Sequence, residues 1–289
     1  MGNKVVRSIC LLLILLGVTG LASCRRTELV FAIDRFWYNS GYFSREMVSK
    51  LKTTAARNGA KLDIVVAGEG KSESPNLQDI VAEGKPDILL LSPLLTRQTG
   101  EPLTLPQAVR YVGISLDPLE QVNPEHYGII SVSRYAAMRD LGTELCKYLQ
   151  EKQVPGITGF WYTEGEVGKR EYHDFYKAFT ADCAAEQISI TEIGRADLGT
   201  PENFLRDFQP EQGMIGLAFA ADQNQTYLEE FRERGLGIAG EYIFLEDFPD
   251  TNPLFSIELP LETIVGTAAA KAPGWGEKIE VDAVLIKRK

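Results

Sequence analysis

Short apolar runs and longer amphipathic runs alternate along the chain from residue 28 onward, and this alternation constrains the fold most. The runs with strand character cover 28–33, 61–67, 86–93, 109–115, 127–133, 156–162, 188–194, 213–220, 236–246, 254–260 and 281–287. The runs with helical character cover 44–58, 75–84, 135–150, 166–182, 201–208, 223–234 and 261–270. Continuous apolar strands are typical of parallel sheets, which are buried on both faces. The alternation therefore predicts right-handed βαβ units and an α/β fold built from doubly wound parallel sheets.

The number of strands predicts how the chain divides. Eleven strand-like runs are too many for one compact sheet in a chain of 289 residues. A chain of this length is long enough for one large domain or two ordinary ones. Two similar α/β lobes that divide near 118–128 fit the pattern better, and no repeat of 20–50 residues is present.

The first 24 residues have the layout of an export signal. Lys4 and Arg7 form a basic start, residues 8–20 are apolar or small, and Leu21-Ala-Ser-Cys24 follows. The apolar run is too short to be a spanning helix. The last four residues resemble a bacterial lipobox, which implies cleavage before Cys24 and a lipid on its thiol. We therefore expect a signal peptide at 1–23, a lipidated anchor segment at 24–27 and a membrane-anchored protein on the periplasmic or extracellular face; a signal peptide without lipidation is the alternative.

The charge excludes several classes of partner. The formal net charge of −10 becomes −12 when Lys4 and Arg7 leave with the signal peptide. A chain this acidic is not expected to bind nucleic acid, which requires a basic surface. The same charge argues against electrostatic attachment to anionic lipid, so the acyl chain is expected to hold the protein alone.

Two cysteines and two histidines limit the redox and metal chemistry of the mature chain. Cys146 and Cys183 remain once Cys10 is removed and Cys24 is lipidated, and they would be able to pair outside the cytoplasm. Each lies in a helix-like run, which favours free buried thiols, although sequence spacing does not fix their distance. His126 and His173 are the only histidines and no CxxC motif occurs, so we expect no metal site and no cofactor.

Polar and aromatic residues follow several of the predicted strands. In open α/β sheets the ligand binds outside the carboxyl ends of the strands. This rule selects residues after the strands ending at 33, 162 and 220, with two acids at the expected lobe crossings: Asp34, Arg35, Phe36, Trp37, Tyr38, Thr163, Glu164, Glu166, Asp222, Gln223, Asp117 and Glu258. Aromatic faces and charged groups in a dry cleft suit a polyol or a cation.

Each of these residues also has a structural interpretation. Trp37 and Tyr38 are equally suited to core or lobe packing, and Asp222 is suited to capping the following helix. Asp117 stands before a proline and is suited to shaping a turn. Glu258 is suited to a hydrogen bond within a hinge. The sequence leaves both interpretations open.

Seven segments resemble the type I periplasmic binding proteins of the ribose-binding kind, over nearly all of residues 28–289. They are AIDRFWYNSGYF, PDILLLSP, VRYVGISLD, GFWYTEGEVGKREYHDFYKAF, GMIGLAFAADQNQTYLEEFRERGL, FSIELPLETIVG and VDAVLIKRK. The resemblance implies two lobes joined by a three-strand hinge, with a discontinuous chain: residues 28–120 plus 260–278 in the first lobe, and 121–259 plus 279–289 in the second.

The resemblance also implies a function. It indicates a monomeric receptor of an ABC importer that closes on a sugar or similar small polar solute. Ligand contacts are expected from Asp34, Phe36, Trp37, Tyr38, Asp117, Arg170, Asp222 and Glu258, with Arg170 equally suited to be a solvated helix residue. Ala221, Pro118 and Glu258 depart from the sugar-binding pattern and put monosaccharide specificity in doubt. A ligand-binding sensor or surface interaction protein of the same fold is the alternative.

Enzymatic and nucleotide-binding motifs do not fit their required context. Gly235-Leu-Gly237-Ile-Ala-Gly240 matches G-x-G-x-x-G, but a predicted helix precedes it and a strand follows it. The dinucleotide fingerprint requires the opposite order, so Gly235 is expected to end a helix. No catalytic constellation can be assembled, because His173 has no evident nucleophile near it.

Overall fold

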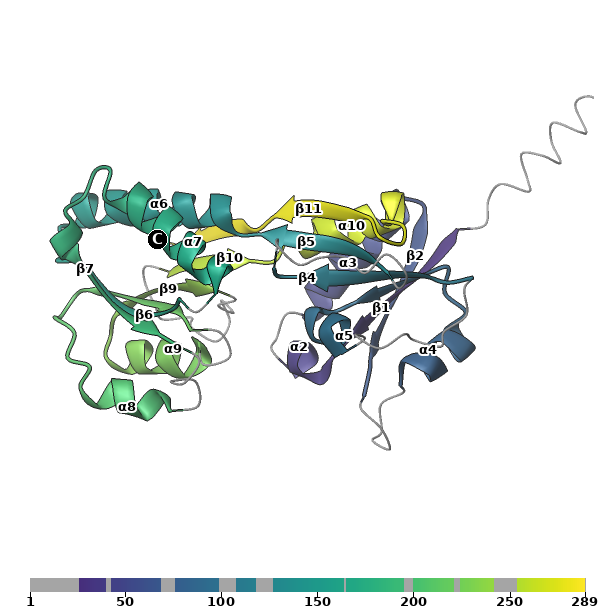
Figure 1. Ribbon diagram of the computed structural model, residues 1–289, viewed down its shortest axis with the longest axis horizontal. Coiled ribbons are helices and arrows are strands. Elements are labelled where there is room, and N and C mark those ends of the chain that lie inside the picture. The colour runs from purple at the N-terminus through teal and green to yellow at the C-terminus, as the bar shows by residue number, and fades with distance from the viewer. Residues whose placement is uncertain are drawn as a thin grey trace, which may run out of the picture.

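The computed structural model describes residues 26–39, 43–68, 76–98, 108–117, 127–163, 165–194, 200–220, 224–241 and 254–288. These residues form two α/β lobes, each built around one six-stranded sheet. The lobes lie side by side along the long axis of the molecule, with several chain segments passing between them (Figure 1). The prediction of two lobes with predominantly parallel sheets is therefore confirmed.

The first lobe contains an entirely parallel sheet in the order β11-β5-β4-β3-β1-β2. Its strands are β1 (Thr27–Ile33), β2 (Ala60–Val66), β3 (Ile88–Leu91), β4 (Arg110–Ser115), β5 (Gly128–Ser133) and β11 (Lys278–Asp282). Its helices are α2 (Arg35–Asn39), α3 (Arg45–Arg57), α4 (Leu77–Gly84), α5 (Pro93–Gln98) and α10 (Leu261–Lys271). All four residues of β3 are buried, as expected of a central strand that helices cover on both faces.

The second lobe contains a sheet in the order β12-β10-β9-β8-β6-β7. Its strands are β6 (Ile157–Tyr162), β7 (Ile188–Ile193), β8 (Ile215–Phe219), β9 (Gly237–Glu241), β10 (Leu254–Glu258) and β12 (Val284–Arg288). The helices are α6 (Tyr135–Lys152), α7 (Glu166–Phe179), α8 (Pro201–Arg206) and α9 (Asn224–Glu233), with the short 3₁₀ helix η1 (Ala185–Gln187). The pairing is parallel except that β12 runs antiparallel to β10.

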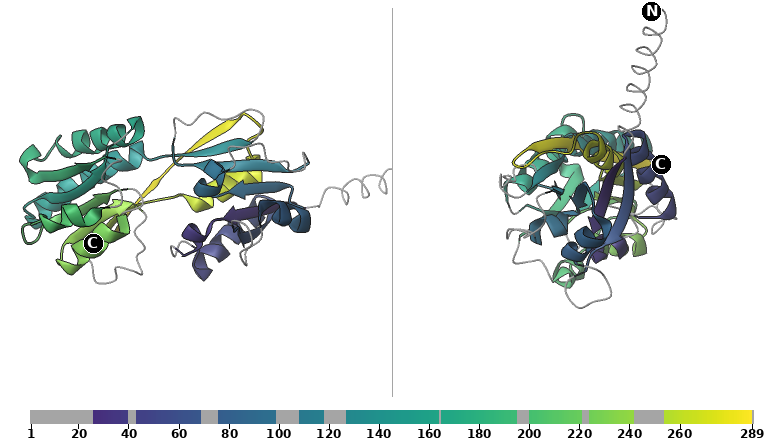
Figure 2. Two further views of the ribbon diagram at one scale, coloured as in Figure 1. Left: turned by 60° about the horizontal axis from the view of Figure 1, so that its bottom comes forward. Right: turned by 90° about the vertical axis from the view of Figure 1, so that its right-hand side faces the viewer.

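The chain crosses between the lobes three times, from β5 to α6, from β10 to α10 and from β11 to β12. Figure 2 shows these crossing segments from a second direction. The first and third crossings run together, because β5 pairs with β11 and Ala283 N–H donates to the carbonyl of Ser133 over 2.8 Å. These three crossings are the hinge that the resemblance implied.

The strand pairing corrects the expected lobe boundaries. Residues 128–133 and 279–282 were expected in the second lobe, but β5 and β11 both belong to the first sheet. The chain therefore crosses at Arg134 and at Ala283. The run 281–287, expected as one strand, divides at Ala283 into strands of two different sheets. Residues 35–39, where no helix was expected, form the five-residue helix α2.

The two cysteines of the second lobe correct another expectation. Cys146 on α6 and Cys183 after α7 form a disulfide with Cα atoms 5.8 Å apart, where free thiols were expected. The reason is tertiary, because α6 and α7 pack directly against each other and bring together two residues 37 positions apart. Spacing along the sequence does not contain this information.

Local sequence signals explain most element boundaries. The hydroxyl of Ser44 accepts the N–H of Met47 and caps α3, and the side chain of Asn76 caps α4 in the same way. Gly235 adopts φ +69° between α9 and β9, as expected of a residue that ends a helix. Within the described residues no helix is both long enough and apolar enough to span a bilayer.

Candidate functional site

In the first lobe, the carboxyl end of β1 carries Asp34, which binds its own neighbours. Ser92, which follows β3, donates its hydroxyl to the Asp34 carboxylate over 2.6 Å and accepts the Asp34 N–H at 3.3 Å. The other carboxylate oxygen accepts the N–H of Trp37 at 2.9 Å, inside the first turn of α2. Asp34 is buried. Both of its oxygens are therefore used to join β1, β3 and α2, which is a structural role.

The aromatic residues expected at this end of the lobe take different positions. Trp37 is 7% exposed and packs against Phe31 and Phe43, with ring centroids 6.4 and 6.2 Å away. It therefore follows the core interpretation. Tyr38 is 56% exposed on α2. The helix α2 lies at the end of the first lobe nearer to the second lobe (Figure 1). The side chain of Phe36 lies outside the described residues.

The two acids expected at lobe crossings differ in their surroundings. Glu258 is the last residue of β10, directly before the second crossing, and its half-buried carboxylate accepts the hydroxyl of Ser256. Asp117 follows β4, whose next strand in the chain, β5, lies in the same sheet, so its expected place at a crossing is wrong. Asp117 nevertheless contributes to the electrostatic environment of Tyr135 and Glu171, at the true first crossing.

A buried ion cluster occupies that first crossing. The guanidinium of Arg134, which links β5 to α6, donates to both carboxylate oxygens of Glu171 on α7, at 2.8 and 2.9 Å. A third N–H donates to Glu241 at the end of β9. The exposed fractions of the three side chains are 15%, 3% and 7%. We call these three residues the hinge cluster, because they connect the crossing to two other elements of the second lobe.

The hinge cluster has one guanidinium for two carboxylates. Burial raises the pKa of Glu171 above its ordinary value, and the nearby carboxylates of Glu241 and Asp117 raise it further, against the lowering effect of Arg134. The excess of acidic groups favours hydrogen-bond donors or a positive charge at this position.

Tyr135 and Arg170 lie beside the hinge cluster. The Arg170 guanidinium carbon stands 4.1 Å from the centre of the Tyr135 ring, in a cation–π contact. The Tyr135 hydroxyl is buried and has no hydrogen-bond partner among the residues that the structure describes. Burial raises the pKa of Tyr135, so this hydroxyl keeps its proton near neutral pH and is available as a donor. A buried polar atom of this kind calls for a partner from outside the described residues.

The sequence-based prediction missed most of this cluster. Arg134 follows β5 directly and so satisfies the strand-end rule. It was not selected, because it was interpreted as a connection between the strand 127–133 and the helix expected from 135. Glu241 was placed inside a strand expected to continue to 246, and it is the last residue of β9 among the described residues. Glu171 had a helical signal, because Glu171, Phe175 and Phe179 repeat every four residues and are the buried residues of α7. Four other candidates, Cys24, Glu164, Asp222 and Gln223, lie outside the described residues.

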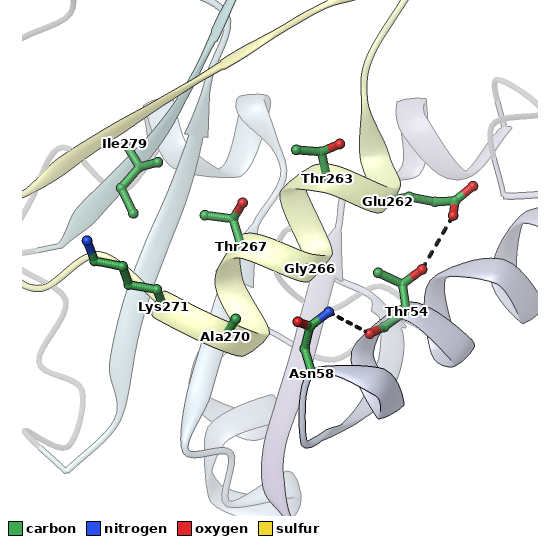
Figure 3. Close-up of a pocket in the computed structure, with 9 residues that line it drawn as sticks. All are labelled: Thr54, Asn58, Glu262, Thr263, Gly266, Thr267, Ala270, Lys271 and Ile279. Atoms are coloured by element: carbon green, nitrogen blue, oxygen red, sulfur yellow. Dashed lines mark hydrogen bonds between the residues drawn. The ribbon is translucent and has the colours of Figure 1, made fainter.

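A hollow on the flank of the first lobe is a different kind of site. It lies between α3 and α10 and has a volume of about 610 Å³. Figure 3 shows that the side chains along its rim interact with one another: Asn58 donates to the carbonyl of Thr54 at 2.9 Å, and Thr54 donates to Glu262 at 3.4 Å. Gly266 allows α3 to approach, since a Cβ there would stand 3.3 Å from the Thr54 methyl group. This hollow is away from the strand carboxyl ends of both sheets.

Metal-ligating groups do not gather in the part of the chain that the structure describes, where no set of three or more His, Cys, Asp or Glu residues is arranged to hold an ion. The hinge cluster instead offers carboxylates and a guanidinium already joined by hydrogen bonds, with a phenol beside them. Such an arrangement can orient a hydroxylated or amino-bearing molecule.

Comparison with solved structures identifies the fold. A LacI transcriptional regulator from a Rhodococcus species aligns over 91% of this chain and 96% of its own, with a TM-score of 0.55 and 14% identity. A periplasmic solute-binding protein of an ABC transporter from Actinobacillus succinogenes, with bound D-allose, aligns over 90% and 97% (TM-score 0.51, 12% identity). A LacI-family regulator from Weissella paramesenteroides with bound sucrose aligns over 90% and 96% (0.51, 13%).

The chain has the fold of the type I periplasmic binding proteins and LacI-like regulators. The three structures are a binding protein and two transcription regulators, and none of them is an enzyme by its description. No protein-family model matches the sequence, and no curated protein matches it either. The similarity therefore extends to the architecture of both lobes at identities of 12–14%.

Proposed function

We propose that this chain is a lipid-anchored extracytoplasmic receptor of an ABC importer, which binds a sugar or a similar small polar solute between its lobes. The observation that carries the proposal is the combination of a two-lobed fold, three crossings and a buried charge cluster at the first crossing. Type I folds with these lobes include a solute-binding protein with D-allose and a regulator with sucrose.

The chemistry around the hinge cluster supports a hydroxyl-rich ligand. Glu241 and Glu171 provide acceptors, Tyr135 provides a donor, and the cation–π contact holds Arg170 beside them. A sugar presents several hydroxyls that both donate and accept, so it can satisfy groups of both kinds in a dry site. On the first lobe, the exposed ring of Tyr38 offers an apolar face of the type that stacks on a sugar ring.

Binding by such a receptor depends on closure of the lobes. A ligand that contacts both lobes favours the closed state by the difference between its affinities for the closed and open states. The hinge cluster fixes the orientation of α7 and β9 relative to the crossing, so the wall of the second lobe moves as one body. Ordering these groups before the ligand arrives lowers the cost of binding.

The predicted export signal and the disulfide support an extracytoplasmic location. Disulfides persist in oxidising compartments and are rare in the cytosol, and Cys146 and Cys183 are paired. The lipobox-like sequence ending at Cys24 supplies the anchor.

A thermal-shift panel tests the binding proposal. The mature chain is refolded to remove bound ligand and then heated with D-allose, sucrose, ribose, nucleosides, amino acids and polyamines. A sugar present at 100 times its Kd adds about 2.7 kcal/mol to the free energy of unfolding, which for a chain of this size raises Tm by several degrees. A rise with a sugar or polyol supports the proposal. A rise only with amino acids or polyamines, or no rise at all, contradicts the sugar-receptor assignment.

A ligand-controlled sensor is the second candidate, since two of the three similar structures are regulators. The sensor would bind the same class of solute but pass the closed state to a signalling protein. Cross-linking of the anchored protein in its own cells separates the two functions: an importer receptor is recovered with a permease, and a sensor is recovered with a signalling protein.

A further inference from the structure

The amino ends of the first-lobe strands form one end of the molecule, which we call the amino-end pole. All six strands of this sheet are parallel, so their first residues lie together at this end. In Figure 1 the start of β1, in purple, lies at the end of the first lobe farthest from the second lobe. A hollow of about 620 Å³ at this end is lined by Thr27, Arg110, Lys271 and Trp275 among others. Thr27, the first residue of β1, and Trp275 therefore line the same hollow.

Trp275 is unusual among the tryptophans of this chain. Its exposed fraction is 45%, whereas those of Trp37 and Trp161 are 7% and 1%. Tryptophan is typical of the interface between membrane and water, because one side of the indole is apolar and its N–H is a donor. An exposed tryptophan near the first strand of a protein acylated at Cys24 is therefore suited to contact lipid headgroups.

The amino-end pole is basic although the chain is acidic. Basic residues stand at the first or last position of its elements, or directly next to them: Arg26, Arg57, Lys85, Arg110, Lys271 and Lys278. The acids in the same positions are Glu28, Glu83, Asp87 and Glu277. Glu28 is paired with Lys61 on β2, and Asp87 and Glu277 accept backbone N–H groups, from Glu28 and Gly274. The net charge of −10 for the whole chain conceals this local excess of positive charge.

The position of Cys24 restricts what the amino-end pole can face. Three residue steps separate Cys24 from Thr27, and an extended chain covers about 3.5 Å per residue. The start of β1 would therefore lie within about 11 Å of the acylated cysteine. A tether this short restricts rotation of the lobe. It holds the amino-end pole closer to the bilayer than any other surface of the lobe.

We propose that the amino-end pole rests on the membrane, with Trp275 at the level of the lipid headgroups and the basic residues facing anionic phosphates. The inference rests on the proposed acylation of Cys24 and adds an orientation to it. The long axis of the molecule then stands away from the bilayer, and the second lobe is the distal one. Each Lys or Arg near an anionic surface contributes to such attachment, so the acyl chain does not hold the protein alone.

The test uses the full chain, lipidated in a bacterial host that is fed an alkyne analogue of palmitate. Labelling of the native protein, and its loss in Cys24→Ala, establishes the anchor independently of any orientation. The labelled protein is then reconstituted in vesicles of phosphatidylglycerol and phosphatidylcholine, in which some of the lipid carries bromine close to the headgroup. Bromine quenches tryptophan fluorescence only at short range.

The expected result is bromolipid quenching of the native protein, most of which is lost in Trp275→Phe, because the two other tryptophans are buried. The matched control places an indole at the opposite end of the same lobe, as Tyr38→Trp in the Trp275→Phe background. Tyr38 is 56% exposed, and this indole should stay unquenched.

Three results would overturn the proposal. A labelled native protein without quenching shows that the amino-end pole does not contact lipid, and leaves the anchor intact. Equal quenching of the Tyr38→Trp control shows that the lobe has no preferred orientation. Absence of the palmitate label overturns the anchor itself, and the orientation with it.

Discussion

The second lobe contains a disulfide and, at the hinge, a buried ion cluster, whereas the described part of the first lobe contains neither. In the second lobe, Cys146 joins α6 to the end of α7, and Arg134 joins the start of α6 to Glu171 and Glu241. The ion pairs recorded within the first lobe, such as that of Lys61 with Glu28, are largely exposed. Exposed pairs of this kind contribute little to stability.

The first lobe instead relies on its parallel sheet and on short polar contacts at the strand ends. Asp34, Ser92 and Trp37 form such a contact, in which the carboxylate serves the fold. The comparison shows that buried carboxylates of the two lobes have different uses. In the first lobe the acid caps a helix, and in the second lobe acids surround a guanidinium at a crossing. The second lobe is therefore expected to behave as the more rigid half of the hinge.

Arg134→Met is expected to produce the largest loss of stability. The change leaves the carboxylates of Glu171 and Glu241 buried without their shared partner, and breaking a buried pair in this way costs about 3–5 kcal/mol. Urea denaturation measures the free energy of unfolding. The matched control is Arg139→Met on the same helix, whose exposed pair with Asp174 should cost under about 1 kcal/mol. Similar losses for the two variants would mean that the hinge cluster is not a special element of the second lobe.

Removal of the disulfide by Cys146→Ser with Cys183→Ser is expected to have the next largest effect. The bridge closes a loop between residues 37 apart, and chain entropy gives a loss of about 2–4 kcal/mol. Denaturation of the oxidised and chemically reduced native protein should give the same difference. An unchanged midpoint after reduction would show that the bridge does not stabilise the second lobe.

Asp34→Ala tests the structural role of the first-lobe carboxylate. Loss of the cap on α2 and of the acceptor for Ser92 should cost about 2 kcal/mol. Asp34→Asn keeps an acceptor for the Trp37 N–H and should lose about half as much. The affinity for the sugar found in the thermal-shift panel, measured by calorimetry, should be nearly unchanged in Asp34→Asn. A large loss of affinity at retained stability would instead make Asp34 a ligand contact.

Glu171→Gln is expected to have the smallest effect of these substitutions. The effect is a change in how the free energy of unfolding depends on pH. Because burial raises the pKa of Glu171, the folded protein keeps this proton to higher pH than the unfolded chain does. Glu171 therefore stabilises the folded protein fully below the pKa of the unfolded chain, about 4.3. This stabilisation is lost as pH rises through the pKa of Glu171 in the folded protein. The free energy of unfolding of the native protein should fall relative to the variant as pH rises from 4.

Glu144→Gln is the control with the opposite sign. A hydrogen bond from Lys287 lowers the pKa of Glu144, so its contribution is present above the unfolded pKa and is lost as pH falls. The native protein should therefore gain stability relative to this variant as pH rises. Parallel curves for the native protein and Glu171→Gln would show that Arg134 balances the burial of Glu171.

The sequence predicts the regular elements well and their spatial partners poorly. The alternation of strands and helices is local, and it identified nearly every strand of both sheets. The division of 281–287 at Ala283 was missed because apolar character continues across the crossing, and the strand pairing shows where the chain changes sheets. The helix α2 was missed because five residues carry too little periodicity.

The candidate site was predictable only in part for the same reason. Asp117 and Arg170 were selected by sequence, and both lie around Tyr135. Arg134 pairs with residues 37 and 107 positions away, and no local pattern indicates such a pairing. Trp37 looked like a ligand contact because it follows a strand, but the rings of Phe31 and Phe43 place it in the core.

Small-angle X-ray scattering of the mature protein, with and without the sugar that raises Tm most, tests hinge closure most directly. We expect a smaller radius of gyration at saturation, because the lobes close on the solute, with an unchanged molecular mass. We also expect that Arg134→Met weakens this contraction at equal saturation, since the wall of the second lobe is no longer held to the crossing. An unchanged radius at a concentration where calorimetry shows saturation would contradict binding by closure of the two lobes.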